Sequence, residues 1–270
     1  MSCVLASVQA DRSVIAERVA KLTRTSTWTL ASSVRIAFPT FHPQGMVKIG
    51  DTIIVSSVDR AGKGHVFKMD LAGKLLADVP IGESAMYHPG GIDYDGRYIW
   101  VPVAEYRPDS RSIIYRIEPD TMKAHEVFRV DDHIGAIVHN TDDDTLHGVS
   151  WGSRRFYRWR MDGKGQQRTL NPSHYVDYQD CKYAGRRRMV CSGVTEIRQT
   201  PTAMPFRLGG IDLVDLRDGR PLHQVPVLLW TANGLDMTHN PVWLEPNQTG
   251  LRAYFMPEDD ASTLYIYEAQ

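Results

Sequence analysis

The stretch HPGGIDYDGRYIWVPVAEY, residues 88–106, has the pattern of a β-hairpin headed by a histidine. Its first half leads into the pair Asp95-Gly96, which is typical of a tight turn. Its second half, Tyr98 to Val103, is rich in β-branched and aromatic residues. We therefore expect two antiparallel strands, with His88 at the start of the first and Glu105 at the end of the second.

The same pattern occurs five times along the chain. Each copy starts with a histidine and continues through turn-forming residues into a second apolar strand, and the copies begin at His42, His88, His133, His174 and His239. Successive histidines lie 46, 45, 41 and 65 residues apart. One or two further strand patterns follow each hairpin, and a four-stranded propeller blade typically spans about 40–45 residues. Each repeat therefore predicts one blade.

The repeat resembles the β-propeller class over nearly the whole chain from residue 27, without the motif set of any one family. The fifth repeat lacks a fourth strand, and the strand-like segment 27–38 belongs to no repeat. We predict an all-β, five-bladed propeller of four-stranded blades in which residues 27–38 complete the last blade. Such closure hides sheet edges. The propeller is expected to be a single domain, 27–270, preceded by an arm or short helix within 1–26, where residues 11–22 are the best helix candidate.

Composition and hydropathy argue against nucleic-acid and membrane partners. The chain has 31 Lys and Arg against 32 Asp and Glu, without a basic stripe, which disfavours nucleic-acid binding. It contains no apolar run near the roughly 18 residues of a membrane helix. The first ten residues lack the features of a secretory signal, so we expect a cytoplasmic protein.

Three cysteines do not form a disulfide framework. Cys181 and Cys191 flank the turn of the fourth hairpin and could face each other across it. In a cytoplasmic protein, two reduced thiols packed in a sheet are favoured.

The resemblance implies that the first strand of each blade lines the central channel and starts at the ligand-binding face. His42, His88, His133, His174 and His239 would then surround the channel mouth, and neutral imidazoles suit a divalent transition metal such as manganese, iron, nickel or zinc. Acidic residues end the second strands at Asp59, Glu105, Glu196 and Glu258, where they could orient the imidazoles. The alternative is structural: a histidine repeated once per blade can tie down the loop before it.

The expected positions of these residues around the channel mouth suggest their roles in catalysis and substrate binding. We predict His88, His133, Glu105 and Glu196 as catalytic residues. The residues placed to contact a substrate are Tyr106, Arg107, Trp151, Asp177, Gln179 and Arg207. The segment 197–208 is expected to project over the same face, as a lid or simply as a long loop.

The function favoured by this pattern is that of a metal-dependent lyase or hydrolase acting on a small polar or anionic molecule. Propeller lyases that use channel-mouth histidines and a divalent metal look like its nearest analogues, at the level of architecture alone. One alternative is a five-bladed glycoside hydrolase with paired carboxylates. Another is a non-catalytic binding module, which predicts near-identical pockets in every blade.

Overall fold

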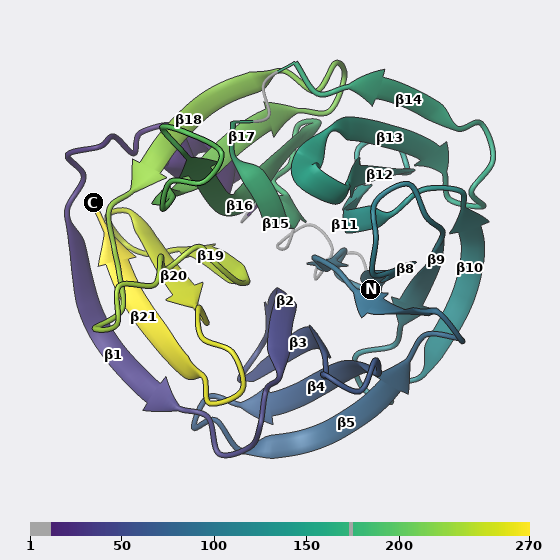
Figure 1. Ribbon diagram of the computed structural model, residues 1–270, viewed down its shortest axis with the longest axis horizontal. Coiled ribbons are helices and arrows are strands. Elements are labelled where there is room, and N and C mark those ends of the chain that lie inside the picture. Colours follow the sequence, from purple (N-terminus) through teal and green to yellow (C-terminus); the bar gives the residue numbers. More distant parts are fainter. Residues whose placement is uncertain (1–11, 173–174) are drawn as a thin grey trace.

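The computed structural model describes residues 12–172 and 175–270 of the chain, and within them it is a five-bladed β-propeller. The five antiparallel sheets are arranged around a common central axis, called the channel here (Figure 1). Four blades have four strands, and in the second blade the innermost strand is divided in two. The predicted fold class and blade number are confirmed.

The blades follow one another along the chain. Blade 1 consists of β2 (His42–Ile49), β3 (Thr52–Val58), β4 (Gly64–Asp70) and β5 (Leu75–Ile81). Blade 2 consists of β6 (Met86–Pro89), β7 (Asp93–Tyr94), β8 (Ile99–Glu105), β9 (Ser112–Ile117) and β10 (Ala124–Val130). Blade 3 consists of β11 (Ile134–Asn140), β12 (Thr145–Ser150), the 3₁₀ turn η1 (Trp151–Ser153), β13 (Arg155–Arg160) and β14 (Gln167–Leu170).

Blade 4 consists of β15 (Asp177–Tyr183), β16 (Arg188–Ile197), β17 (Phe206–Asp215) and β18 (Pro221–Val227). Blade 5 consists of β19 (Val242–Pro246), β20 (Leu251–Phe255), β21 (Thr263–Ala269) and, as its outermost strand, β1 (Trp28–Arg35). Strand β1 pairs antiparallel with β21, with Trp28 opposite Ala269 and Arg35 opposite Thr263. The two ends of the propeller chain thus share one sheet, as predicted, and this pairing closes the ring (Figure 1).

The hairpin at 88–106 forms around the side chain of Asp95. One carboxylate oxygen, Oδ1, accepts hydrogen bonds from the N–H groups of Arg97 and Tyr98, while Gly96 supplies the positive φ of 97° that the turn requires. The other oxygen accepts a hydrogen bond from Trp100 Nε1. The predicted hairpin is present, but its first strand is interrupted between β6 and β7.

The interruption reflects close approach of the inner strands in the channel. The N–H of Gly91 in blade 2 donates to the carbonyl oxygen of Gly135 in blade 3, at 2.7 Å. A Cβ added to Gly90 would lie 2.1 Å from that same oxygen, so only glycine fits there. The inner strands therefore meet just beneath the histidines and give the channel mouth a floor.

Asp180 of β15 ties this floor together. Its carboxylate accepts hydrogen bonds from the N–H of Met46 in blade 1, at 3.0 Å, and the N–H of Ile92 in blade 2, at 3.2 Å. Lys182 of the same strand forms an ion pair with it and donates to the carbonyl oxygen of Ile92. One buried side chain thus joins three blades across the channel.

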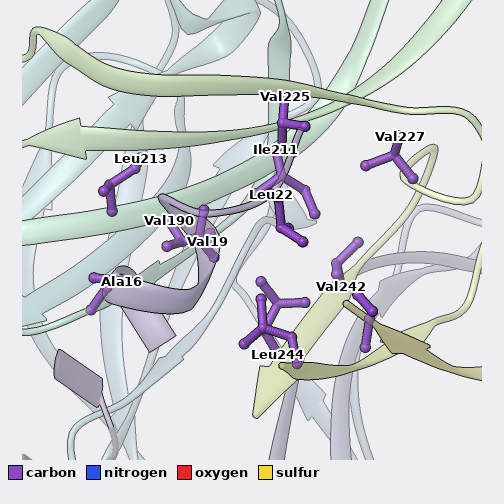
Figure 2. Packing of buried hydrophobic residues seen from close by; sticks show 14 of the residues in the cluster. Ala16, Val19, Leu22, Val190, Ile211, Leu213, Val225, Val227, Val242 and Leu244 are labelled. Atoms are coloured by element: carbon purple, nitrogen blue, oxygen red, sulfur yellow. The ribbon is translucent and has the colours of Figure 1, made fainter. Parts of the chain in front are cut away.

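The N-terminal helix spans residues 12–19, inside the predicted segment 11–22. Its buried face, with Ala16, Val19 and nearby Leu22, packs against blades 4 and 5 through residues that include Val190, Ile211 and Leu244 (Figure 2). Ala184 and Val190 of this cluster lie beside the end of β15 that is farther from the histidines. The helix therefore covers the end of the channel that lies opposite the histidines. Among the described residues, no helix is long and apolar enough to cross a membrane.

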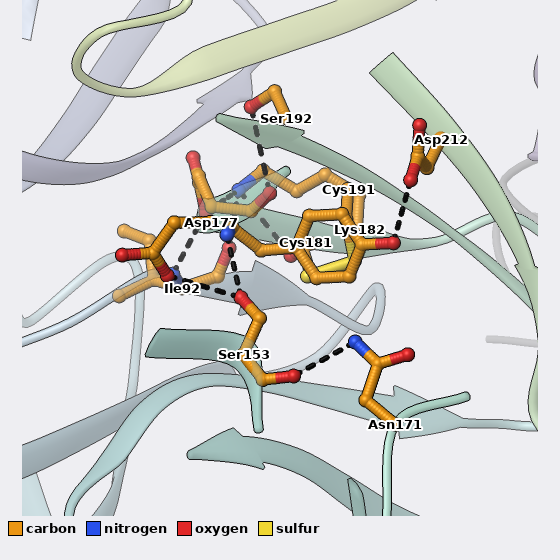
Figure 3. The surroundings of a disulfide bond; sticks show 11 residues. Ile92, Ser153, Asn171, Asp177, Cys181, Lys182, Cys191, Ser192 and Asp212 are labelled. Carbon is orange, nitrogen blue, oxygen red and sulfur yellow. Dashed lines mark hydrogen bonds and ion pairs between the residues drawn. A yellow bond between two sulfur atoms is a disulfide. The ribbon is translucent and has the colours of Figure 1, made fainter. Parts of the chain in front are cut away.

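Cys181 and Cys191 form a disulfide in blade 4 (Figure 3). The register of β15 and β16 places them directly opposite each other, with Cα atoms 4.1 Å apart. Both side chains are buried in one apolar cluster. This corrects the expectation of two reduced thiols, which rested on the cytoplasmic assignment and not on strand register.

Candidate functional site

A hollow of about 550 Å³ lies at the channel mouth, above the floor formed by the inner strands. It is lined by His42 and Gln44 from β2, His88 from β6, and residues from blades 2, 3 and 4, namely Tyr106, His133, Gly135, Ser150, Trp151, Gly152, Asp177, Tyr178 and Gln179. Three of the predicted metal ligands and four of the predicted substrate contacts therefore line one cavity. The cavity forms because every blade starts its inner strand at this face.

His88 is a buried histidine of the hollow whose two ring nitrogens are both unsatisfied among the described residues. Its side chain is nearly buried, at 5% exposure, and neither Nδ1 nor Nε2 finds a hydrogen-bond partner among the described residues. Burial, followed by the proximity of His133 and His42, lowers the pKa of His88 to about 3. The imidazole is therefore neutral at physiological pH, and a buried polar group without a protein partner is a place where a water, an ion or a ligand can bind.

His133 lies beside it, with ring centroids 5.6 Å apart. Its Nδ1–H donates to the carbonyl oxygen of Glu105 at 2.8 Å and to that of Arg107 at 3.2 Å. Since both acceptors are carbonyl oxygens, the proton is on Nδ1 and the lone pair is on Nε2. Burial lowers the pKa of His133 although both hydrogen bonds act to raise it.

His42 is held in the same way by a carboxylate. Its Nδ1 lies 2.8 Å from Asp259 Oδ1, which also accepts a hydrogen bond from Asn240 Nδ2. A carboxylate acceptor at Nδ1 leaves the lone pair of neutral His42 on Nε2. Asp259 is therefore the acidic residue that orients a histidine here, one position beyond the predicted Glu258.

An aromatic wall stands against the histidines. Tyr106 stacks on His88 with ring centroids 4.3 Å apart and an interplanar angle of 10°. Trp151 meets His133 edge to face at 4.6 Å and lies 5.5 Å from Tyr106. Tyr106 is half exposed while His88 beneath it is buried, so the tyrosine ring covers His88 from solvent.

Among the described residues, no carboxylate of Glu105, Glu196 or Glu258 contacts a channel-mouth imidazole, and the predicted Asp59 lies 3.7 Å from His65 instead. The Glu105 carboxylate binds Arg107 and Arg111, each at 2.7 Å, and hydrogen bonds from Arg111 and then Arg107 lower its pKa. The Glu196 carboxylate binds Arg207 at 2.6 Å and Arg198 at 3.1 Å. Glu258 accepts hydrogen bonds from Thr263 N–H and Tyr265 Oη. The partners of these glutamates lie close to them at the ends of the strands. The positions of the acids in the sequence do not reveal these pairings.

The remaining predicted residues are divided between the hollow and its surroundings. Asp177 and Gln179 line it, and Asp177 Oδ1 accepts a hydrogen bond from Ser153 Oγ (Figure 3). Arg107 and Arg207 do not line it, because they pair with Glu105 and Glu196. His239 lies near Asp259 and His42 but outside the hollow, and burial lowers its pKa. His174 lies outside the described residues.

The predicted lid is an extension of a hairpin. β16 and β17 remain paired out to Ile197 and Phe206, so the segment 197–208 contains a two-stranded ladder and a short connecting loop. Ile197, Met204 and Phe206 are exposed. Glu196 and Arg207 face each other across this ladder, which accounts for their ion pair.

The sequence did not indicate Asp259, which orients His42, or five residues that line the hollow, namely Gln44, Gly135, Ser150, Gly152 and Tyr178. Gln44 lies two positions after His42 on β2, and period-2 alternation would have indicated it. Asp259 follows the predicted Glu258, and its role depends on the backbone path after β20. Within residues 12–172 and 175–270, no group of three or more His, Cys, Asp or Glu side chains is already arranged to hold a metal ion. Any metal proposal therefore rests on the chemistry of the donors.

Solved structures with similar folds have distant sequences. The major Malassezia sympodialis allergen Mala s 1 matches with a TM-score of 0.57 and 7% identity, over 89% of this chain and 97% of that one. The GH43 endo-arabinanase from Bacillus licheniformis matches with a TM-score of 0.50 and 14% identity, over 86% and 95%. The tail fibre of Staphylococcus aureus phage P68 matches with a TM-score of 0.51 and 10% identity, over 93% of this chain but 54% of the fibre. These likenesses show the fold alone.

No curated protein matches the sequence. One family model does, over residues 2–270. The chain therefore belongs to the family of unknown function DUF6454.

Proposed function

We propose that the hollow at the channel mouth is the active site of a metal-dependent lyase or hydrolase that acts on a small polar molecule. The observation that carries this proposal is His88, a buried imidazole with both ring nitrogens unpartnered among the described residues. Leaving such a group without a partner costs free energy, about 1–3 kcal/mol for a buried polar group. A ligand to His88 in the working protein would recover that energy.

The types of donor suit a divalent transition metal, and binding would have to draw them together, since within residues 12–172 and 175–270 they are not already arranged around one. His88, His133 and His42 all line the hollow, and the partners of His133 and His42 leave Nε2 as the lone-pair nitrogen of each. Metal-binding histidines commonly donate their other nitrogen to a carboxylate or a backbone carbonyl, as these two do. A metal held there would polarise a carbonyl group or lower the pKa of a bound water.

The chain's own residues would prepare the substrate. Tyr106 and Trp151 provide aromatic surface beside His88, while Gln44 and Gln179 offer amide groups for hydrogen bonds. Tyr106 limits the access of water to His88.

Two observations favour this function over the alternatives. Of the described residues that line the hollow, Asp177 alone carries a carboxylate, whereas a glycoside hydrolase normally needs two. The blades also contribute different side chains to the hollow, whereas a repeated binding module predicts equivalent pockets. Arg107 and Arg207 are paired with glutamates, so the site offers less to an anionic substrate than their positions suggest.

Elemental analysis by mass spectrometry on protein purified without an affinity tag tests the proposal. We expect about one equivalent of manganese, iron, nickel or zinc in the wild type, and its loss in His88→Ala and His133→Ala. The matched control is His125→Ala, which changes a histidine of β10 that lies 3.5 Å from Glu118 and outside the hollow. Wild-type protein that is metal-free and refuses added metal would contradict the proposal. If metal is bound, substrates for lyases and hydrolases are screened next.

A further inference from the structure

A second hollow adjoins the first at the same face of the propeller. It has a volume of about 660 Å³, and its walls include the aromatic residues Phe41, Tyr87 and Tyr106 and the acids Asp59, Asp259 and Asp260. His42 and Tyr106 line both hollows. The two hollows therefore adjoin, with His42 and Tyr106 in the wall that they share; the first is called the deeper lobe and the second the second lobe.

Neighbouring groups hold two carboxylates of the second lobe in place. Burial acts to raise the pKa of Asp59, but hydrogen bonds from the N–H groups of Lys63 and Ala61 and the charge of nearby His65 hold it below its ordinary value. Asp59 is therefore negatively charged at neutral pH. The Oδ1 atom of Asp259 lies 2.8 Å from His42 Nδ1 and accepts a hydrogen bond from Asn240 Nδ2.

One guanidinium lines this lobe, and it lies at the rim. Arg60 pairs with Asp260 at 2.7 Å, and its side chain is 88% exposed. The lobe is lined by three carboxylates and one guanidinium, and Asp59 and Asp259 also lie 3.7 Å from His65 and 2.8 Å from His42. Arg60 pairs with Asp260, so carboxylates outnumber guanidinium groups in the lobe.

A negatively charged lobe with three aromatic side chains fits an organic cation. Carboxylates attract the charge directly, and the faces of tyrosine and phenylalanine rings attract it through their quadrupoles. An anionic group would be repelled, and a neutral polyol would gain stacking without the charge attraction. The deeper lobe, where His88 lacks partners among the described residues, is then left for the part of the molecule that reacts.

We infer that the second lobe binds an ammonium group of the substrate while the reacting group of the same molecule lies at His88. The assignment of the reacting end rests on the proposed function; the cation site does not. The substrate class is accordingly a small molecule with a quaternary or substituted ammonium group at one end and a polar, metal-binding group at the other. Tyr106 contacts both halves.

Isothermal titration calorimetry with choline tests the cation site, with 3,3-dimethyl-1-butanol as a neutral probe of the same shape. We expect choline to bind at least about tenfold more tightly than the alcohol, since cation–π and carboxylate attraction act on the cation alone. Tyr87→Leu and Asp59→Asn should each weaken choline binding by about five- to tenfold. Arg60→Gln removes a competing positive charge and should bind choline more tightly than the wild type.

Equal binding of choline and the alcohol, or choline affinity unchanged in Tyr87→Leu and Asp59→Asn, would overturn the inference. Arg60→Gln is an exposed change that is expected to fold, so it keeps the test decisive if Asp59→Asn is unstable. Weaker choline binding in Arg60→Gln would also contradict the inference. The titrations need neither metal nor turnover. Protein that binds choline but no metal would refute the proposed function alone. Protein that binds metal but not choline would refute this inference alone.

Discussion

Replacing Asp180 with alanine should destabilise the propeller severely, because one carboxylate serves three blades. The change leaves the N–H groups of Met46 and Ile92 without their acceptor in the channel, at a cost of about 1–3 kcal/mol each. It also leaves Lys182, whose side chain is 13% exposed, without its counter-ion. Breaking a buried pair in this way typically costs about 3–5 kcal/mol.

The three losses are coupled and do not add fully. We expect about 4–6 kcal/mol in total, which is a large part of the roughly 5–15 kcal/mol that stabilises a typical protein. Urea unfolding monitored by circular dichroism measures this loss in the free energy of unfolding. With a slope of about 3 kcal/mol per M, the midpoint should fall by about 1.3–2 M.

Two further variants separate the contributions. Asp180→Asn keeps an oxygen for one of the two N–H groups and should lose less stability than Asp180→Ala. Adding Lys182→Met to Asp180→Asn removes the unpaired ammonium and should recover part of the loss. The surface control Asp162→Asn, at a half-exposed position, should change little. An Asp180→Ala midpoint equal to that of Asp162→Asn would refute the reasoning.

Three other changes test separate parts of the structure. Burial lowers the pKa of His147 to about 4, so the stability that depends on its neutral form is present above pH 6.5 and is lost as the pH falls toward 4. Between pH 7.5 and pH 5 the wild type should lose about 2 kcal/mol more than His147→Asn in urea titrations, and parallel pH profiles would contradict this. Removing the disulfide with Cys181→Ala/Cys191→Ala opens a loop with a sequence separation of 10 and should lower the free energy of unfolding by about 2–3 kcal/mol. Free thiols found by mass spectrometry in the untreated protein would show that the bond does not form. Gly90→Ala places a Cβ 2.1 Å from the Gly135 carbonyl oxygen and should lower the melting temperature strongly. Gly50→Ala should lower it far less, because Gly50 has a positive φ but no atom lies within 4 Å of the added Cβ. Equal shifts of the two melting temperatures in a thermal scan would argue against the close contact of the inner strands.

The disulfide also bears on where the protein works. Disulfides persist mainly in oxidising compartments. The cytoplasmic assignment was drawn from the first ten residues of the sequence and remains a prediction. The thiol measurement above therefore also tests that assignment.

The sequence was most informative about the hairpins. Turn residues such as Asp95-Gly96 and the β-branched run at Ile53 to Val58 are local signals, and each predicted hairpin appears within a few residues of its expected bounds. The missing fourth strand of the fifth repeat predicted the place of β1 in blade 5. The histidine at the head of each repeat was equally visible, and His42, His88 and His133 do line one hollow.

The sequence was least informative about which side chains form hydrogen bonds and ion pairs with one another. Glu105 was expected to orient an imidazole with its carboxylate, yet its carbonyl oxygen does so, while its carboxylate binds two arginines. The acid that holds His42 is Asp259 instead of Glu258, a difference of one residue in a loop. Strand register decided the pairing of Cys181 with Cys191. A shift of one residue reverses the face of every side chain, and a linear pattern cannot fix it.

By itself, the sequence determined the class of fold, the number of blades and the way the ring closes, because these depend on turns and alternation between near neighbours. The tertiary structure alone decided which polar atoms are satisfied. Asp180 finds its two N–H donors 134 and 88 residues away, and His42 finds its carboxylate at a separation of 217. His88 has neither nitrogen paired among the described residues. Such contacts exist only after five blades have closed around a common axis, since closure brings distant segments within hydrogen-bond distance.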